Sequence, residues 1–185
     1  MVENVHRDTR DRMTKALEKL RGDLHAVRTG KATPAILDPV RVEYYGSQVP
    51  LSQVASVSAP QPRMLVVQPW DKAAAEPILK GIQGANLGLN PSQDGELIRV
   101  PIPPLTEERR HEFVKRCRQL AEEARVAMRN VRRDANEELT RAEKEKTISE
   151  DDLHRGQKET QKITDEEIAK IDQLLAAKEK EILEG

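Results

Sequence analysis

All 11 prolines of this 185-residue chain lie between residues 34 and 104, and neither flanking segment contains one. Proline fixes φ and removes a backbone N–H donor, so long helices are allowed in the flanks and disfavoured in the middle. Charge divides the chain at nearly the same places, because residues 30–104 hold only 12 of the 63 Lys, Arg, Asp and Glu side chains. The sequence therefore predicts two helical flanks around an inserted module of a different kind.

The flanks carry apolar residues at the alternating three- and four-residue steps of helices that pack along one another. In the first flank these steps run from Met13 to Val27, and Gly30 is expected to end the helix. In the second flank Thr106 is expected to cap a helix that runs to about Lys146. The apolar stripe predicted for this second helix consists of Phe113, Cys117, Leu120, Ala124, Ala127, Val131 and Ala135.

A third helix is predicted after the stretch KTIS, where Ser149 and Asp152 form a capping pair. At about 1.5 Å per residue, the two later helices should be on the order of 50 to 60 Å long. Each of the three helices has only a narrow apolar stripe, which suits elongated packing and not a large globular core. We therefore expect an elongated three-helix bundle formed by residues 1–29 and 105–185.

The middle segment, residues 30–104, is predicted to be a small β/α/β domain. Alternating residues favour a strand from Val40 to Tyr44, followed by a turn at Gly46. Further strands are expected around residues 54–57, 64–67 and 97–100. A short helix is expected to begin soon after Asp71, with Pro77 in its first turn. The predicted fold class is thus α+β, a three-helix bundle with an inserted β/α/β domain.

The chain must pass between the two predicted domains twice, through two short connections that contain no strand. Such connections make a hinge plausible, and the prolines limit its range of motion. The residues expected to form the hinge are Thr29, Gly30, Lys31, Pro103, Pro104 and Leu105.

The sequence offers no constellation typical of an enzyme. The motifs of phosphate-binding loops, dinucleotide-binding loops and nucleophile elbows are all missing. His6, His25, His111 and His154 have no metal-ligand spacing, and Cys117 falls on an apolar stripe, where a buried small residue is expected. We therefore expect a protein without catalytic activity, cofactor or metal.

One cysteine excludes an internal disulfide, which favours a reducing compartment. No apolar run approaches the roughly 20 residues that span a bilayer, and the N-terminal sequence lacks the apolar region of a signal peptide. We expect a cytoplasmic protein without a membrane partner. The near balance of 31 basic and 32 acidic side chains argues against a general polyanion binder, although it allows a local basic patch.

One such patch interrupts the mixed charges of the second predicted helix. The stretch RVAMRNVRR contains Arg125, Arg129, Arg132 and Arg133 and no acidic residue. At about 100° per residue these arginines project into one sector, roughly opposite the apolar stripe, and should face solvent. Glu122 and Glu137 can pair with the first and last arginine, whereas Arg129 and Arg132 have no partner at helical spacing.

Two interpretations of the patch remain open, an ordinary solvated face and a surface that contacts phosphates. The planar guanidinium group is well suited to phosphate. Two further cations, Arg28 and Lys31, stand where the first helix is expected to end. No aromatic platform accompanies these cations, so the backbone of a structured RNA is a better partner than single strands. The candidate RNA-binding residues are Arg28, Lys31, Arg125, Arg129, Arg132 and Arg133.

Several ordered runs of this sequence resemble the ribosome recycling factor family over nearly the whole chain. The runs are RTGKATPAILD from Arg28, YYGSQVPLSQVASV from Tyr44, QPWD from Gln68, LGLNP from Leu87, IRVPIPPLTEERR from Ile98, EEARVAMRNVRRDA from Glu122, ISEDD from Ile148 and TDEEI from Thr164. Chance similarity does not produce so many runs in order. The length and the inserted middle segment also agree with the family.

The resemblance implies a two-domain factor that binds the ribosome left on messenger RNA after termination. Together with elongation factor G and GTP, it would split that ribosome into subunits, with no catalytic activity of its own. It also implies that the bundle contacts large-subunit ribosomal RNA through Arg28, Arg129 and Arg132. Family members commonly have arginine where this chain has Lys31, which keeps the charge and loses the bidentate geometry.

The resemblance favours a protein that acts as a monomer with the ribosome and elongation factor G as partners. Two other classes of protein fit the composition, a coiled-coil adaptor that recognises only proteins and a general RNA chaperone. The adaptor predicts that loss of Arg129 and Arg132 has no effect. The chaperone predicts binding to RNA in the absence of ribosomes.

Overall fold

The computed structural model describes residues 1–184. This part of the chain forms two compact units. The first unit consists of Met1–Thr29 and Glu107–Glu184, and the second of Gly30–Thr106. Leu105 and Thr106 thus group with the second unit.

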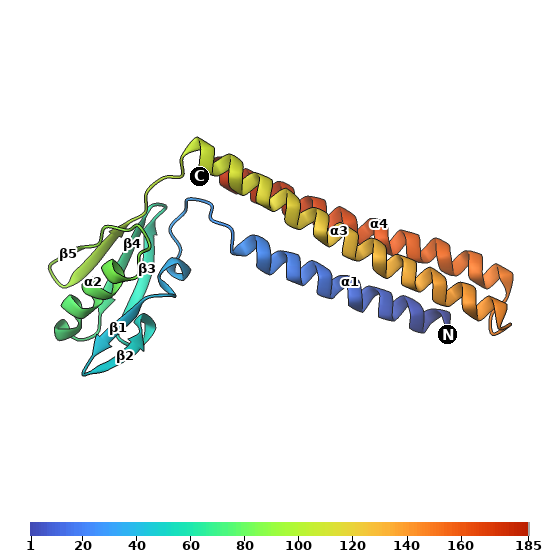
Figure 1. The fold of residues 1–185 in the computed structure, drawn as a ribbon, viewed down its shortest axis with the longest axis horizontal. Helices are drawn as coiled ribbons and strands as arrows, with labels where there is room; N and C mark the ends of the chain where they lie inside the picture. The colour runs from blue at the N-terminus through green and yellow to red at the C-terminus, as the bar shows by residue number, and fades with distance from the viewer. Residues whose placement is uncertain (185) are drawn as a thin grey trace. The chain divides into compact units, whose positions relative to one another are not determined.

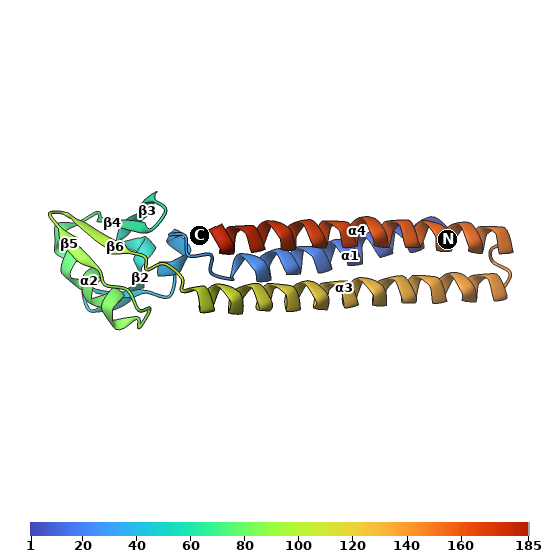
Figure 2. The same cartoon turned by 90° about the horizontal axis from the view of Figure 1, so that it is seen from above.

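The first unit is built from three long helices, α1 (Val2–His25), α3 (Glu107–Lys144) and α4 (Glu150–Glu184). Figures 1 and 2 show them side by side over most of their lengths. With 38 and 35 residues, α3 and α4 are about 57 and 52 Å long, as predicted. The expected end of the first helix at Gly30 is wrong, because α1 ends at His25. Just after this end, Val27 N donates to Leu24 O at 3.1 Å, so the hydrogen bond spans three residues and not the four of an α-helix.

The core of this unit follows the predicted stripes, but the buried residues of α3 differ in part from those predicted. Cys117, Leu120, Ala124, Val131 and Ala135 are buried as expected, whereas Phe113 and Ala127 are only half-buried. The core positions that the prediction omitted are Val114, Ala121, Met128, Leu139 and Ala142. Because α3 packs against both α1 and α4, its buried face is wider than the single seam of a two-helix contact.

The turn between α3 and α4 ends in the predicted cap. Asp152 N donates to Ser149 Oγ at 3.0 Å, and Ser149 N donates back to Asp152 Oδ2 at 3.2 Å. Each side chain thus satisfies a backbone donor that the first turn of a helix leaves open. The hydrogen bonds from Ser149, with a further one from Arg155, lower the pKa of Asp152.

The end of the bundle near this turn has a second, smaller apolar cluster and a group of buried polar residues. His6, Thr9, Thr160 and Thr164 are buried there. The Nε2 atom of His6 lies 3.0 Å from Gly156 O and must carry the proton, since a carbonyl oxygen only accepts. A Cβ at Gly156 would lie 3.1 and 3.3 Å from the two methyl groups of Leu139, so glycine allows α4 to approach α3 closely here.

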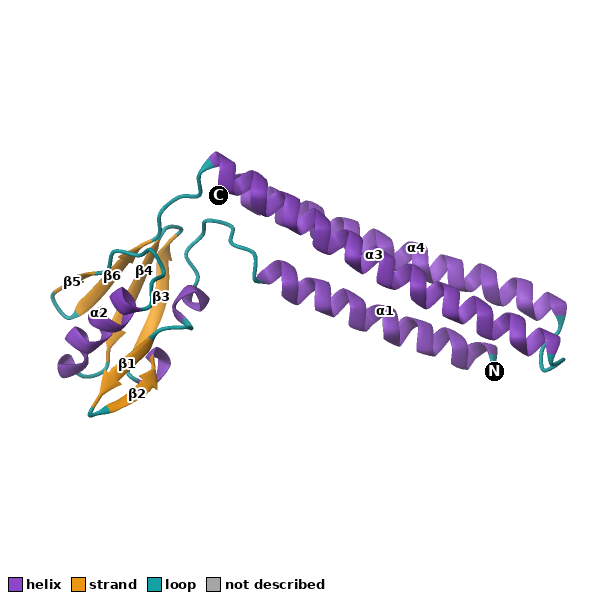
Figure 3. Ribbon diagram, viewed as in Figure 1, coloured by secondary structure: helices purple, strands orange, loops and turns teal. Residues whose placement is uncertain are grey.

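The second unit contains a two-stranded and a four-stranded antiparallel sheet (Figure 3). The hairpin pairs β1 (Arg41–Tyr44) with β2 (Ser47–Pro50), and the larger sheet has the order β3-β4-β6-β5. Its strands are β3 (Ala55–Gln61), β4 (Met64–Pro69), β5 (Ser92–Asp94) and β6 (Leu97–Pro101). Short 3-10 turns cover Pro34–Leu37, Leu51–Gln53 and Lys72–Ala74. The predicted strands are present, while β2 and β5 were not predicted.

Helix α2 (Ala75–Gly84) packs against β1 and contributes Ile78 and Ile82 to the core of this unit. As predicted, Asp71 begins the helical segment, since Ala73 N donates to Asp71 Oδ1 at 3.0 Å, and Pro77 lies in the first turn of α2. The chain is therefore an α+β protein with a three-helix unit and an inserted β/α/β unit.

Both connections leave the second unit beside the same turn. Ala32 N donates to Pro62 O at 2.7 Å, and Ile102 N donates to Arg63 O at 2.8 Å. Pro62 and Arg63 form the turn between β3 and β4. The last backbone anchors of the unit are therefore Ala32 at one end and Ile102 at the other.

Candidate nucleic-acid interface

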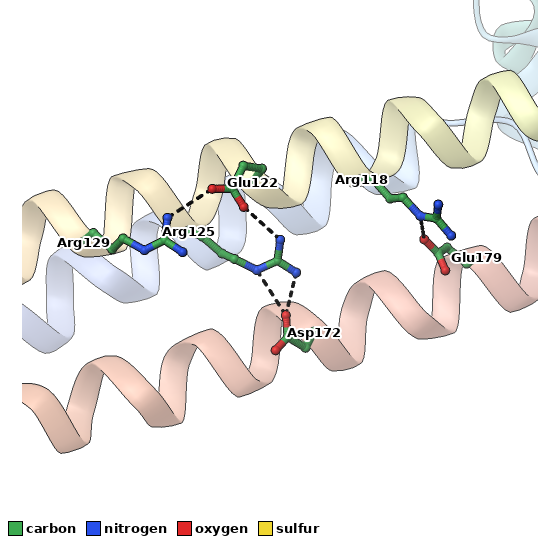
Figure 4. A network of polar contacts seen from close by, with 6 residues as sticks. All are labelled: Arg118, Glu122, Arg125, Arg129, Asp172 and Glu179. Atoms are coloured by element: carbon green, nitrogen blue, oxygen red, sulfur yellow. Dashed lines mark hydrogen bonds and ion pairs between the residues drawn. The ribbon is translucent and has the colours of Figure 1, made fainter.

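The four clustered arginines all lie on α3, and the structure gives them different environments. Arg125 is the most enclosed, with a side chain only 21% exposed. Its Nε and Nη2 donate to Asp172 Oδ1 of α4 at 3.2 and 2.6 Å, and its Nη1 donates to Glu122 Oε2 at 3.2 Å (Figure 4). Arg125 thus ties α3 to α4, and the expectation that it faces solvent is wrong.

Arg129 also has a partner that the sequence analysis did not foresee. Its Nη1 donates to Glu122 Oε1 at 3.1 Å, across two turns of the helix (Figure 4). The hydrogen bonds from Arg129 and Arg125 lower the pKa of Glu122. Arg129 nevertheless stays 44% exposed, so one ion pair at the surface leaves part of its guanidinium group open to a ligand.

Arg132 and Arg133 form no ion pair within residues 1–184, so no carboxylate neutralises their charges. Arg132 Nη1 donates to the neutral Gln161 Oε1 of α4 at 3.3 Å, a hydrogen bond between helices that leaves Arg132 without an acidic partner at helical spacing, as predicted. The predicted pair between Arg133 and Glu137 does not form, and Arg133 is exposed. These two arginines therefore present the largest uncompensated positive charge of the segment RVAMRNVRR.

The two remaining candidates, Arg28 and Lys31, are not residues of α3. Arg28 is exposed in the first unit, just after α1, whereas Lys31 is exposed and belongs to the second unit. Val27, next to Arg28, lines the same surface hollow as Leu120 of α3. Arg129 lies roughly 13 Å further along α3 at the usual helical rise. Arg28 thus adds a separate cation and does not extend the cluster.

The cationic side of α3 continues beyond the predicted segment, which the sequence analysis missed. Arg141 and Lys144 line the same groove as Arg132 and Arg133. Their spacing of eight and 11 residues from Arg133 is a signal in the sequence, since such positions share one helix face.

No group of His, Cys, Asp and Glu within residues 1–184 could hold a metal ion. Cys117 is buried, as predicted, and this burial raises the pKa of its thiol. None of the helices within the described range has the length and apolarity that a membrane span requires.

The fold and the arginine-rich helix together define a two-unit α+β protein with a cationic face on its helical unit. A sequence profile described as ribosome recycling factor matches residues 20–183. The ribosome-recycling factor of Carboxydothermus hydrogenoformans is 54% identical over 183 residues, which cover 99% of both chains. The chain belongs to the ribosome recycling factor family.

Two solved structures agree with this assignment. A solution structure of a ribosome recycling factor has a TM-score of 0.72 at 42% identity, over 100% of this chain and 98% of that one. The second concerns the Thermus thermophilus factor, described with Escherichia coli elongation factor G bound to the E. coli post-termination complex. It has a TM-score of 0.62 at 52% identity, over 99% of both chains.

Proposed function

We propose that this protein binds the ribosome that remains on messenger RNA after termination and splits it into subunits together with elongation factor G and GTP. The observation that carries the proposal is the match to ribosome recycling factors over the full chain, at 42 to 54% identity. The post-termination complex with elongation factor G, described for a relative that is 52% identical, supports both partners.

We further propose that the helical unit contacts large-subunit ribosomal RNA through Arg129, Arg132 and Arg133. Their charges are exposed or lack an acidic partner, which leaves them available to phosphates. Arg125 is already engaged by two carboxylates, so its role in this proposal is to hold α3 against α4 beneath the contact. Arg28 and Lys31 contribute separate contacts, one from each unit.

In this proposal the second unit turns on a hinge formed by Thr29, Gly30, Lys31, Pro103, Pro104 and Leu105. The backbone anchors at Ala32 and Ile102 support these limits, because the hinge residues lie outside them. Gly30 adopts φ +82, which suits a glycine and would strain another residue.

This protein and elongation factor G have different roles in the proposed mechanism. Elongation factor G acts on the second unit and supplies the energy of GTP hydrolysis. The long helices then convey the load to the RNA contact, since packed helices bend little. The protein acts as a cytoplasmic monomer that contributes geometry and no chemistry. The lack of a phosphate-binding loop motif in the sequence is consistent with this assignment.

A ribosome-splitting assay tests the proposal. Post-termination ribosomes are mixed with the protein, elongation factor G and GTP, and subunit separation is followed as a fall in light scattering. We expect splitting only when all components are present. Splitting that needs no elongation factor G, or GTP turnover by the purified chain alone, would overturn the proposal. Binding to free RNA as tight as to ribosomes would favour an RNA chaperone.

A further inference from the structure

A shallow, open groove of about 530 Å³ lies between side chains along the C-terminal part of α3 and is lined by this helix alone. Its lining residues are Arg132, Arg133, Asn136, Glu137, Thr140, Arg141 and Lys144. From the first to the last of these, the groove extends about 18 Å at the usual helical rise. It holds four cationic side chains and a single carboxylate.

The cations of this groove differ from three arginines that precede them on α3. On α3, Arg118, Arg125 and Arg129 each form an ion pair, at 2.7, 2.6 and 3.1 Å. No ion pair within residues 1–184 joins Arg133, Arg141 or Lys144, although Glu137 lies four residues from both arginines. Ordinary surface helices pair such charges at this spacing, so the groove concentrates uncompensated positive charge.

We propose that this groove binds several consecutive phosphates of ribosomal RNA, with Arg141 and Lys144 as contact residues beyond the segment RVAMRNVRR. The inference rests on the proposed function, because the groove begins at Arg132 and continues the RNA contact toward the end of α3. Phosphates are the ligands that match a row of guanidinium and ammonium groups.

The side chains of the groove favour RNA over an acidic protein segment. Protein interfaces have an apolar centre, whereas interfaces with nucleic acid are polar and strongly positive. This groove contains no apolar side chain, and its uncharged members are Asn136 and Thr140. The Oδ1 atom of Asn136 is buried without a hydrogen-bond partner among the described residues. A ribose 2′-hydroxyl is a donor that the amide could meet by rotating.

Binding to purified bacterial large ribosomal subunits, measured over a series of salt concentrations, tests the proposal. The variant carries Arg141→Ala and Lys144→Ala. The matched control carries Arg118→Ala and Lys170→Ala, which remove the same charge from residues already paired with Glu179 and Glu167. We expect the groove variant to bind about tenfold more weakly or worse, and its slope of log K against log salt to fall in magnitude by about 2. The control should change neither value appreciably.

The outcomes separate this inference from the proposed function. Equal binding by the groove variant and the control would overturn the inference, while a loss with Arg129→Ala and Arg132→Ala would leave the RNA contact of the proposed function standing. If poly-L-glutamate competes as well as duplex RNA, and only when the groove is intact, the groove takes an acidic protein segment and the inference is wrong. If the groove variant binds weakly, the RNA site is supported. If the intact protein fails to split ribosomes, the recycling activity is refuted, whatever the groove variant does.

Discussion

Arg125 donates from both Nε and Nη2 to a single oxygen of Asp172, at 3.2 and 2.6 Å, and so joins α3 to α4. The same guanidinium group also reaches Glu122, which in turn accepts from Arg129 (Figure 4). The arginines of α3 are therefore divided between a structural pair and the exposed groups available to a ligand.

This division predicts different effects for two alanine substitutions. Arg125→Ala should lower the free energy of unfolding by about 1 kcal/mol, because it removes partly buried, charge-assisted hydrogen bonds. Arg132→Ala loses one bond to a neutral amide and should affect stability less, while it weakens binding to large ribosomal subunits by about tenfold. Urea unfolding and binding at matched salt give the two quantities.

Arg118→Ala is the control for the binding measurement, because Arg118 is paired with Glu179 at 2.7 Å. If Arg125→Ala weakens binding as much as Arg132→Ala in a folded protein, Arg125 belongs to the contact surface. If Arg132→Ala binds as tightly as the control, Arg132 does not.

Glu122 gives a prediction about pH. Hydrogen bonds from Arg129 and Arg125 lower its pKa in the folded protein, so the ionised form stabilises the fold. That contribution is complete above the unfolded value of about 4.3 and is lost as the pH falls through the lower folded value. The free energy of unfolding should therefore fall more steeply below about pH 4.5 in the intact protein than in Glu122→Gln. Urea unfolding of both proteins between pH 7 and pH 3 measures the difference, and parallel curves would contradict the pairing.

Gly156 provides a test of the packing between α3 and α4. A methyl group at Gly156 would meet Leu139 at 3.1 and 3.3 Å, so the fully buried side chain of Leu139 would have to shift within the core. We expect Gly156→Ala to lower the free energy of unfolding by about 1 to 2 kcal/mol, despite the better helix propensity of alanine. Gly22→Ala is the matched control, since nothing lies within 4 Å of the added group and a gain of about 1 kcal/mol is expected. Thermal unfolding of both variants measures the two changes in stability. A Gly156→Ala variant that is more stable than the intact protein would show that the helices can separate there.

Features that depend on neighbours in the sequence were predictable. The cap formed by Ser149 and Asp152 is a local pattern, and the structure has both of its hydrogen bonds. The distribution of the prolines also distinguished the helical segments from the β-containing segment. Each proline restricts its own backbone, so this signal does not depend on tertiary contacts. The strand β5, Ser92–Asp94, was missed because all of its residues are exposed and show no alternation.

Features that depend on the rotation of one helix against another were not predictable. Arg125 reaches Asp172, and Arg132 reaches Gln161, over sequence separations of 47 and 29 residues. No periodicity within α3 indicates which residues of α4 face it. The pair of Arg129 with Glu122 is different, because residues seven apart share one face of a helix and the spacing is visible in the sequence.

The last prediction concerns the hinge and distinguishes a mechanical factor from a passive binder. In the proposed mechanism the helical unit binds RNA, whereas splitting requires the second unit and its freedom to turn. The helical unit has its own core, which includes Leu20, Leu120 and Ile171, so a chain with residues 31–104 replaced by a short Gly/Ser linker should still fold. Circular dichroism checks the helices. This shortened chain should bind ribosomes and compete with the intact protein in light-scattering assays, yet it should not split them, because the surface for elongation factor G is gone. Splitting at the intact rate by the shortened chain would refute transmission of force through the second unit.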